Sequence, residues 1–104
     1  MLISKSKVAE GDIVAFKIVT GDEIVGKLVG ETADAFEIDR PCTVMPSQQG
    51  IGLIQSMFTS DPKISISISK THVIMHAPVI PQMESHYITT TTGIQQMTKG
   101  GIIT

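Results

Sequence analysis

Residues 20–38, TGDEIVGKLVGETADAFEI, form the stretch of sequence that decides the fold. The segment 13–20 before it and the segment 23–30 within it both carry the residue pattern of β-strands, and Gly21 lies between them. Because glycine tolerates the positive φ of a tight hairpin, Gly21 predicts that the two strands pair antiparallel. Gly26 falls inside the second strand, where a missing side chain lets the backbone bend. We therefore expect a small, strongly bent sheet that closes as a barrel.

The composition supports an all-β domain. The chain has 104 residues, of which 41% are apolar and 17% charged, so it is long enough for one domain with a single core. The apolar residues are mainly Ile and Val, and only four residues are aromatic, which favours strands over helices. The net charge of −2 excludes a general electrostatic attraction to nucleic acid, so any phosphate contact must come from locally placed lysines.

Further strands are expected along the middle of the chain. A third strand covers 36–45 and is interrupted by Pro41, which cannot donate a ladder hydrogen bond. The segments 53–58 and 64–69 are both extended, and the TSDP sequence breaks or bulges the run between them. A short last strand covers 73–77. With the interrupted run counted as one strand, the sequence predicts five antiparallel strands.

After the last expected strand, the strand pattern ends and the sequence favours a helix followed by a tail. The sequence predicts three parts: an N-terminal arm over 1–12, a barrel over 13–78, and a helix with a tail over 79–104. Pro81 suits the first turn of a short helix, and Met83 and Tyr87 lie one turn apart on it. Gly93 is a plausible helix stop, so we expect a loose tail over 95–104.

Two short motifs carry a resemblance to a known family. Residues 21–38 contain Gly21, Gly26 and the run KLVG, followed by Asp34 and apolar residues; residues 68–74 read ISKTHVI. In this order and separation they resemble the two motifs of the Sm/LSm family, which folds as a five-stranded, SH3-like barrel. The tail HYITTTTGI also resembles that of small Sm-like proteins from marine phages.

The resemblance implies an oligomer and a binding site. Family members pair the fourth strand of one subunit with the fifth of the next, so we expect a homo-oligomeric ring of roughly five to seven subunits. Two loops then line the pore and bind single-stranded RNA or DNA. By position, Asp34 and Phe36 fall in the first loop. Lys70, Thr71 and His72 fall in the second, where a Lys and a His repeated around a ring would make a positive collar.

The chain also differs from the family pattern, which keeps other functions open. It contains no Asn, and Lys70 stands where the family has Arg. Phe36 can be a core residue instead of a stacking platform, and Lys70 and His72 can be solvated turn residues. The alternatives to a nucleic-acid-binding ring are a structural or scaffolding ring of phage type, or an SH3-like module that binds a peptide at its edge.

Other site chemistries are not expected. His72 and His76 on one strand would lie about 13 Å apart, too far for one metal ion. Cys42 is the single cysteine and reads as a buried thiol. We expect no enzymatic activity and no cofactor. The N-terminal sequence lacks the apolar run of a signal peptide, so we expect a cytoplasmic protein with no membrane partner, in the host cytoplasm if the origin is a phage.

Overall fold

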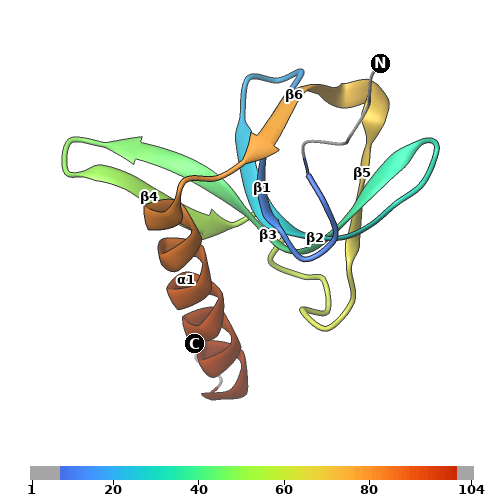
Figure 1. Ribbon diagram of the computed structural model, residues 1–104. Coiled ribbons are helices and arrows are strands. Elements are labelled where there is room, and N and C mark those ends of the chain that lie inside the picture. The colour runs from blue at the N-terminus through green and yellow to red at the C-terminus, as the bar shows by residue number, and fades with distance from the viewer. Residues whose placement is uncertain (1–7, 101–104) are drawn as a thin grey trace.

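The chain folds into one antiparallel sheet followed by a C-terminal helix (Figure 1). The computed structural model describes the backbone of residues 8–100 and the side chains of residues 8–92. The strands are β1 (Ile13–Ile18), β2 (Glu23–Glu31), β3 (Ala35–Ser47), β4 (Gly50–Gln55), β5 (Ile66–Ser69) and β6 (Val73–Pro78). A short 3-10 turn, η1 (Lys70–His72), joins β5 to β6, and the helix is α1 (Pro81–Gly100). The predicted β-rich fold with a C-terminal helix is therefore confirmed.

The glycine-rich stretch turns and bends the sheet as its sequence predicts. Gly21 adopts a φ of 95° in the turn between β1 and β2, where its N–H donates to the Ile18 carbonyl at 2.8 Å. The register between β2 and β3 shifts twice, once around Gly26 and once just before Gly30. A Cβ on Gly26 would collide with the Cγ2 atom of Ile38 on β3. The missing side chain therefore lets the two strands approach where the sheet curves most.

The expectation of a closed, five-stranded barrel is wrong, and the pairing of β3 explains why. This strand is 13 residues long, and its start pairs with β5 over 35–38 while its end pairs with β4 over 42–47. Between these parts Arg40 has a φ of 45° and Pro41 lacks an N–H, so one straight neighbour cannot follow the whole strand. The expected fourth strand is consequently two strands, and the sheet has six.

The sheet also stays open along its ends. Its strand order is β4-β3-β2-β1-β6, with β5 beside β3, and no pairing between described residues joins β5 to β6. In Figure 1 the β3–β4 hairpin extends to one side above α1, and β5 stands on the other side. The structure is thus a curved, open sheet and not a barrel closed by its own hydrogen bonds.

The core has two parts, one on each face of the curved sheet. The inner part is centred on Phe16, Leu28 and Ile38, all almost completely buried, and Val8 of the N-terminal segment joins it at 5% exposure. The outer part packs Val25 and other side chains of the sheet against α1. The predicted N-terminal arm therefore contributes to the core at Val8, its first described residue, whereas residues 1–7 lie outside the described part.

Helix α1 is longer than expected. It runs through Gly93 to Gly100, so the predicted stop at Gly93 and the start of a loose tail at 95 are wrong, while 101–104 lie outside the described residues. Tyr87 is 2% exposed and its hydroxyl donates to the Asp39 carbonyl at 2.6 Å, which fixes the helix on the sheet. Thr91 donates its hydroxyl to the Tyr87 carbonyl at 2.9 Å. Packing thus overrides the weak helix propensity of the threonines. Among the described residues, no helix combines the length and hydrophobicity that crossing a membrane requires.

Candidate nucleic-acid interface

The two loops singled out in the sequence lie against each other. The Lys70 N–H at the start of η1 donates to the Asp34 carbonyl at 2.8 Å, although 36 positions separate them in the chain. The contact exists because β5 pairs with the start of β3, with Ser69 opposite Ala35. The pairing of these strands therefore brings the β2–β3 turn and η1 together at one end of the sheet.

The β2–β3 turn is held by Thr32, not by Asp34. The Thr32 hydroxyl accepts hydrogen bonds from the N–H groups of Asp34 at 3.3 Å and Ala35 at 3.0 Å, and the Thr32 N–H donates to the Ala35 carbonyl at 2.8 Å. Asp34 itself is exposed. Its carboxylate is therefore available at the surface, and the Thr32 side chain caps the turn.

Lys70 has two partners at the site. Its ammonium lies 2.7 Å from an oxygen of Glu31, at the end of β2, and 5.1 Å from the centre of the Phe36 ring. The Lys70 side chain is 29% exposed and that of Glu31 45%, so the ion pair is solvated and worth about 1 kcal/mol or less. Sequence reasoning missed Glu31, because nothing local to the strand end indicates a partner on η1.

Phe36 is a core residue. It is 5% exposed, and its ring centre lies 5.1 Å from that of Phe16 and 5.0 Å from that of His76. Of the two interpretations left open, burial in the core is the one that the structure shows. A base cannot stack on this ring without displacing Lys70 or opening the core. Phe36 therefore contributes to the site by packing beneath the Lys70 ammonium.

Thr71 and His72 form the exposed part of η1. The hydroxyls of Ser69 and Thr71 are hydrogen bonded at 2.8 Å, and the His72 carbonyl accepts from the Val19 N–H at 2.9 Å. The backbone of the turn is thereby fixed, while the side chains of Thr71 and His72 are exposed. No group of three or more metal-ligating side chains occurs within the part of the chain that the structure describes.

The local charge is less positive than the sequence suggests. Glu31 and Asp34 each carry a carboxylate at this end of the sheet, against one ammonium on Lys70. With His72 neutral, the formal charge of the site is −1 per chain. Binding of a polyanion there depends on how readily Lys70 exchanges Glu31 for a phosphate.

No family model matches the chain, and no curated protein is detectably similar to it.

Proposed function

We propose that this protein is an Sm-like homo-oligomer that binds single-stranded nucleic acid, RNA in preference to DNA, at the β2–β3 turn and η1. The observation that carries the proposal is the hydrogen bond from the Lys70 N–H to the Asp34 carbonyl. It joins the two loops that the motif resemblance assigns to ligand binding, and it does so through backbone atoms, so the arrangement does not depend on the mobile ends of side chains.

Assembly through strand edges supports the proposal. Strand β6 pairs only with β1, and β5 pairs only with β3, so each presents one unpaired edge within the described sheet. Ile74 and Met75 on β6 are 58% and 61% exposed, and β6 has no Lys or Glu to discourage pairing. If β5 of one copy pairs with β6 of the next, a closed ring pairs the free edges of both strands in every copy and repeats the Lys70 site around its axis.

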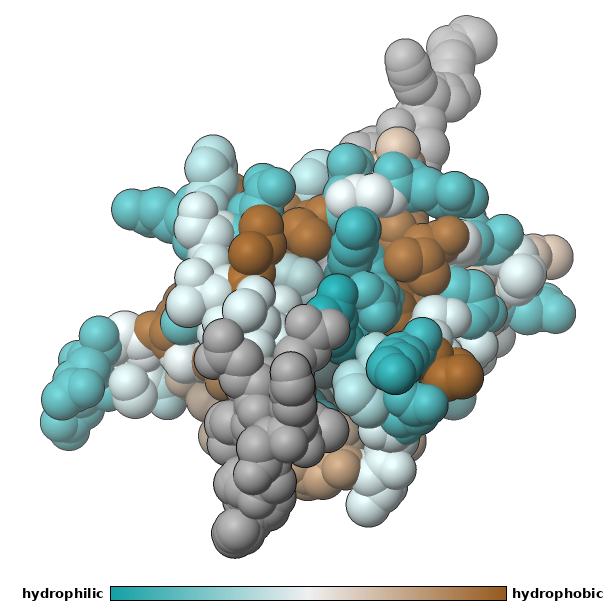
Figure 2. Space-filling view, turned by 90° about the horizontal axis from the view of Figure 1, so that it is seen from below, coloured by the Kyte–Doolittle hydropathy of each residue, from teal (hydrophilic) through white to brown (hydrophobic). Residues whose placement is uncertain are grey.

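The face seen in Figure 2 agrees with association through edges. Apolar side chains form several separate patches there, divided by polar ones. No broad apolar patch is visible on the described surface of this face.

Binding at the ring would use the exposed groups of η1. The Thr71 hydroxyl and the His72 imidazole can donate to or accept from base edges, and imidazole can also stack on an unpaired base. The Lys70 ammonium attracts phosphate when it leaves Glu31. Single-stranded nucleic acid suits such a site because its bases are accessible. Sequence-specific reading is not part of the proposal.

The test is a titration of labelled oligo-U and oligo-A, followed by fluorescence anisotropy. We expect Lys70→Ala to weaken binding roughly tenfold, the effect of losing one hydrogen bond to a charged group. Glu31→Gln should strengthen binding because it releases Lys70. Lys63→Ala removes the same charge from an exposed loop residue and is the matched control, with binding unchanged.

The salt dependence adds a second criterion. Affinity for the oligonucleotide should fall steeply between about 50 and 200 mM salt if phosphates are contacted. Equal losses in Lys70→Ala and Lys63→Ala would remove η1 from the site, and absence of binding at low salt would refute the nucleic-acid function.

A second candidate is a structural or scaffolding ring that binds no nucleic acid. The ion pair between Lys70 and Glu31 favours it, since it leaves the site acidic. Burial of Phe36 favours it too, because the aromatic ring is not presented to a base. This candidate predicts the same oligomer and no binding of oligo-U or oligo-A at any salt concentration.

A further inference from the structure

A groove lies between α1 and the outer face of the sheet, away from the β2–β3 turn and η1. Its volume is about 490 Å³, and the sheet side and the helix side both contribute polar groups. The charged side chains among its lining residues are Lys27, Arg40 and Glu84, so two cations face one carboxylate. The Asp39 carboxylate pairs with Arg40 and neutralises one of these cations, so Lys27 is the cation of the groove for which the described residues provide no ion pair.

Arg40 is the most unusual residue of the groove. It is the only arginine in the chain and the only non-glycine residue with positive φ among those described, at 45°. Backbone in this left-handed region favours Gly or Asn, and other residues there are strained. Such strain is typical of functional sites.

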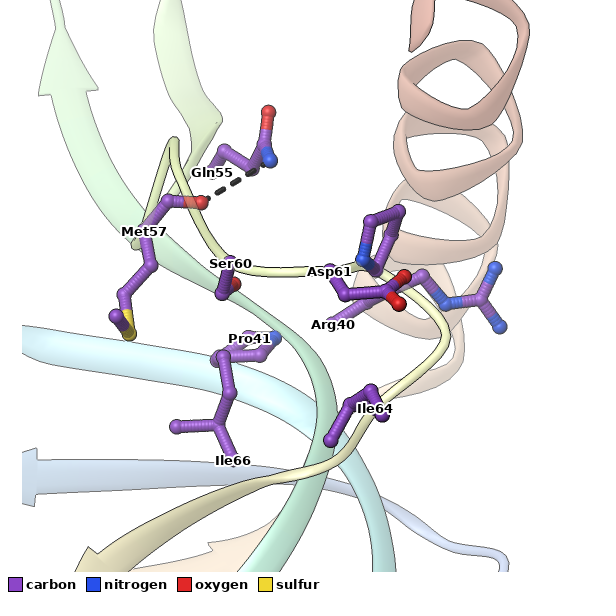
Figure 3. Close-up of a pocket in the computed structure, with 9 residues that line it drawn as sticks. Arg40, Pro41, Gln55, Met57, Ser60, Asp61, Ile64 and Ile66 are labelled. Carbon is purple, nitrogen blue, oxygen red and sulfur yellow. Dashed lines mark hydrogen bonds between the residues drawn. The ribbon is translucent and has the colours of Figure 1, made fainter. Parts of the chain in front are cut away.

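Not every hydrogen-bond donor of the Arg40 guanidinium has an acceptor among the described residues. One terminal nitrogen, Nη2, lies 2.9 Å from a carboxylate oxygen of Asp39, while the Nε–H is buried and has no hydrogen-bond acceptor within the described residues. In Figure 3 the side chain leaves the bend of β3 and ends beside α1, away from Gln55 and Met57. The cavity on that other side, about 20 Å³, has room for about one water molecule. The larger groove is therefore the space that a ligand of Arg40 would occupy.

Lys27 places a second cation in the same groove. It is exposed on β2, directly opposite Asp39 of β3, and it forms no ion pair in the described part of the chain. Glu84 lies in the first turn of α1. The two cations and Asp39 thus come from the sheet, whereas Glu84 comes from the helix.

We propose that this groove is an oxyanion site that binds a phosphate group. A guanidinium and an ammonium converging from neighbouring strands provide charge-assisted donors, and guanidinium matches the geometry of phosphate oxygens. The wall formed by α1 limits solvent on one side, which strengthens these interactions. The phosphate can belong to a free small molecule or to a nucleic-acid backbone. The site is separate from the Lys70 site and does not depend on it.

The test is binding of inorganic phosphate to the full chain, measured by NMR chemical shifts of the Arg40 and Lys27 backbone amides and by isothermal titration. Arg40→Gly removes the guanidinium, and glycine adopts the φ of 45° at this position without strain. Lys27→Gln removes the second cation from an exposed position. We expect each to weaken phosphate binding roughly tenfold or more. Glu84→Gln should strengthen it, because the opposing carboxylate is removed.

A matched control separates this site from its surroundings. Lys63→Gln removes a cation outside the groove and should leave the phosphate-induced shifts of the Arg40 and Lys27 amides as they are in the parent chain. A short oligo-U titrated in parallel distinguishes the sources: shifts at Arg40 that phosphate competes away identify a nucleic-acid backbone, and shifts with phosphate alone identify a small-molecule ligand. Either result supports the site. Failure of phosphate to shift these amides, or shifts that survive both Arg40→Gly and Lys27→Gln, would overturn it.

Discussion

Gly26 lies where β2 crosses the bend of β3, and an added Cβ would meet Ile38 as well as the backbone of Pro41 at 3.3 Å. Gly30 lies on the same strand, but its added Cβ would meet only the Glu37 side chain, at 3.6 Å. The two glycines therefore have different roles. One permits a close approach of strands, and the other has room for a side chain.

We expect Gly26→Ala to lower the free energy of unfolding by about 1 to 3 kcal/mol, the cost of overpacking a tight core. Gly30→Ala should change it by less than about 0.5 kcal/mol. The midpoint of urea unfolding measures both. Equal midpoints for the two variants would show that the sheet can widen at Gly26.

Two buried acids make the fold sensitive to alkali. Burial raises the pKa of the Cys42 thiol from 9.0 to about 11, despite the nearby Arg40 charge. Burial also raises the pKa of Tyr87, and the neighbouring Asp39 carboxylate raises it further. A raised pKa in the folded state means that stability is complete below pH 9 and is lost as the pH rises toward 11, because only the unfolded chain releases the proton.

At pH 10.5 the Cys42 thiol alone should account for a loss of about 2 kcal/mol relative to pH 8. The measurement is the urea midpoint at the two pH values for the parent chain and for Cys42→Ala. The variant should lose less stability over this interval, with Tyr87 responsible for what remains. A loss of the same size in both chains would exclude Cys42 as the cause.

At the scale of elements, α1 depends on its contact with the sheet. Tyr87 supplies a buried ring to the outer core and a hydrogen bond to Asp39. Ile88, the next residue, is 51% exposed and belongs to neither part of the core. The helix is therefore stabilised by packing along one stripe, and its run of threonines forms helix only because that stripe is buried.

Tyr87→Ala should destabilise the protein by about 3 to 5 kcal/mol, as other large aromatic truncations in cores do. Tyr87→Phe keeps the ring and should cost about 1 kcal/mol for the hydrogen bond. Ile88→Ala is the control on the same helix and should have little effect. Thermal unfolding followed at the helical circular dichroism band measures all three, and a small effect of Tyr87→Ala would mean that α1 docks by other residues.

At the scale of the whole molecule, the proposed ring depends on the unpaired edges of β5 and β6. The proposed ring pairs these two edges, so a charge on β6 should interrupt it. Ile74 is exposed on that strand and contributes no buried side chain to the core of one chain. The edge can therefore be altered without altering the fold.

We expect the parent chain to sediment as a multiple of 11.2 kDa and Ile74→Lys to shift toward the single chain. Ile88→Lys introduces the same charge at an exposed site on α1 and should leave the oligomer intact. Sedimentation velocity distinguishes these outcomes. A parent chain that sediments as a monomer would refute the ring and favour the SH3-like module that binds a peptide at its edge.

Local residue patterns sufficed to predict much of this protein. The alternation of Ile and Ser before η1, the turn at Gly21 and the bend at Gly26 each express a backbone preference of one or a few neighbouring residues. The buried state of Cys42 also followed from its immediate surroundings. These features are local, so the sequence alone contains their cause.

Contacts between distant residues decided the rest. Strand β3 is long enough to pair with β4 and β5 at different ends, which split one expected strand into two and left the sheet open. Lys70 meets a glutamate 39 positions away, which changes the charge of the candidate site. Arg40 is held in a left-handed conformation beside a helix that begins 41 positions later. Such features depend on which surfaces meet after folding, and no neighbour in the chain specifies them.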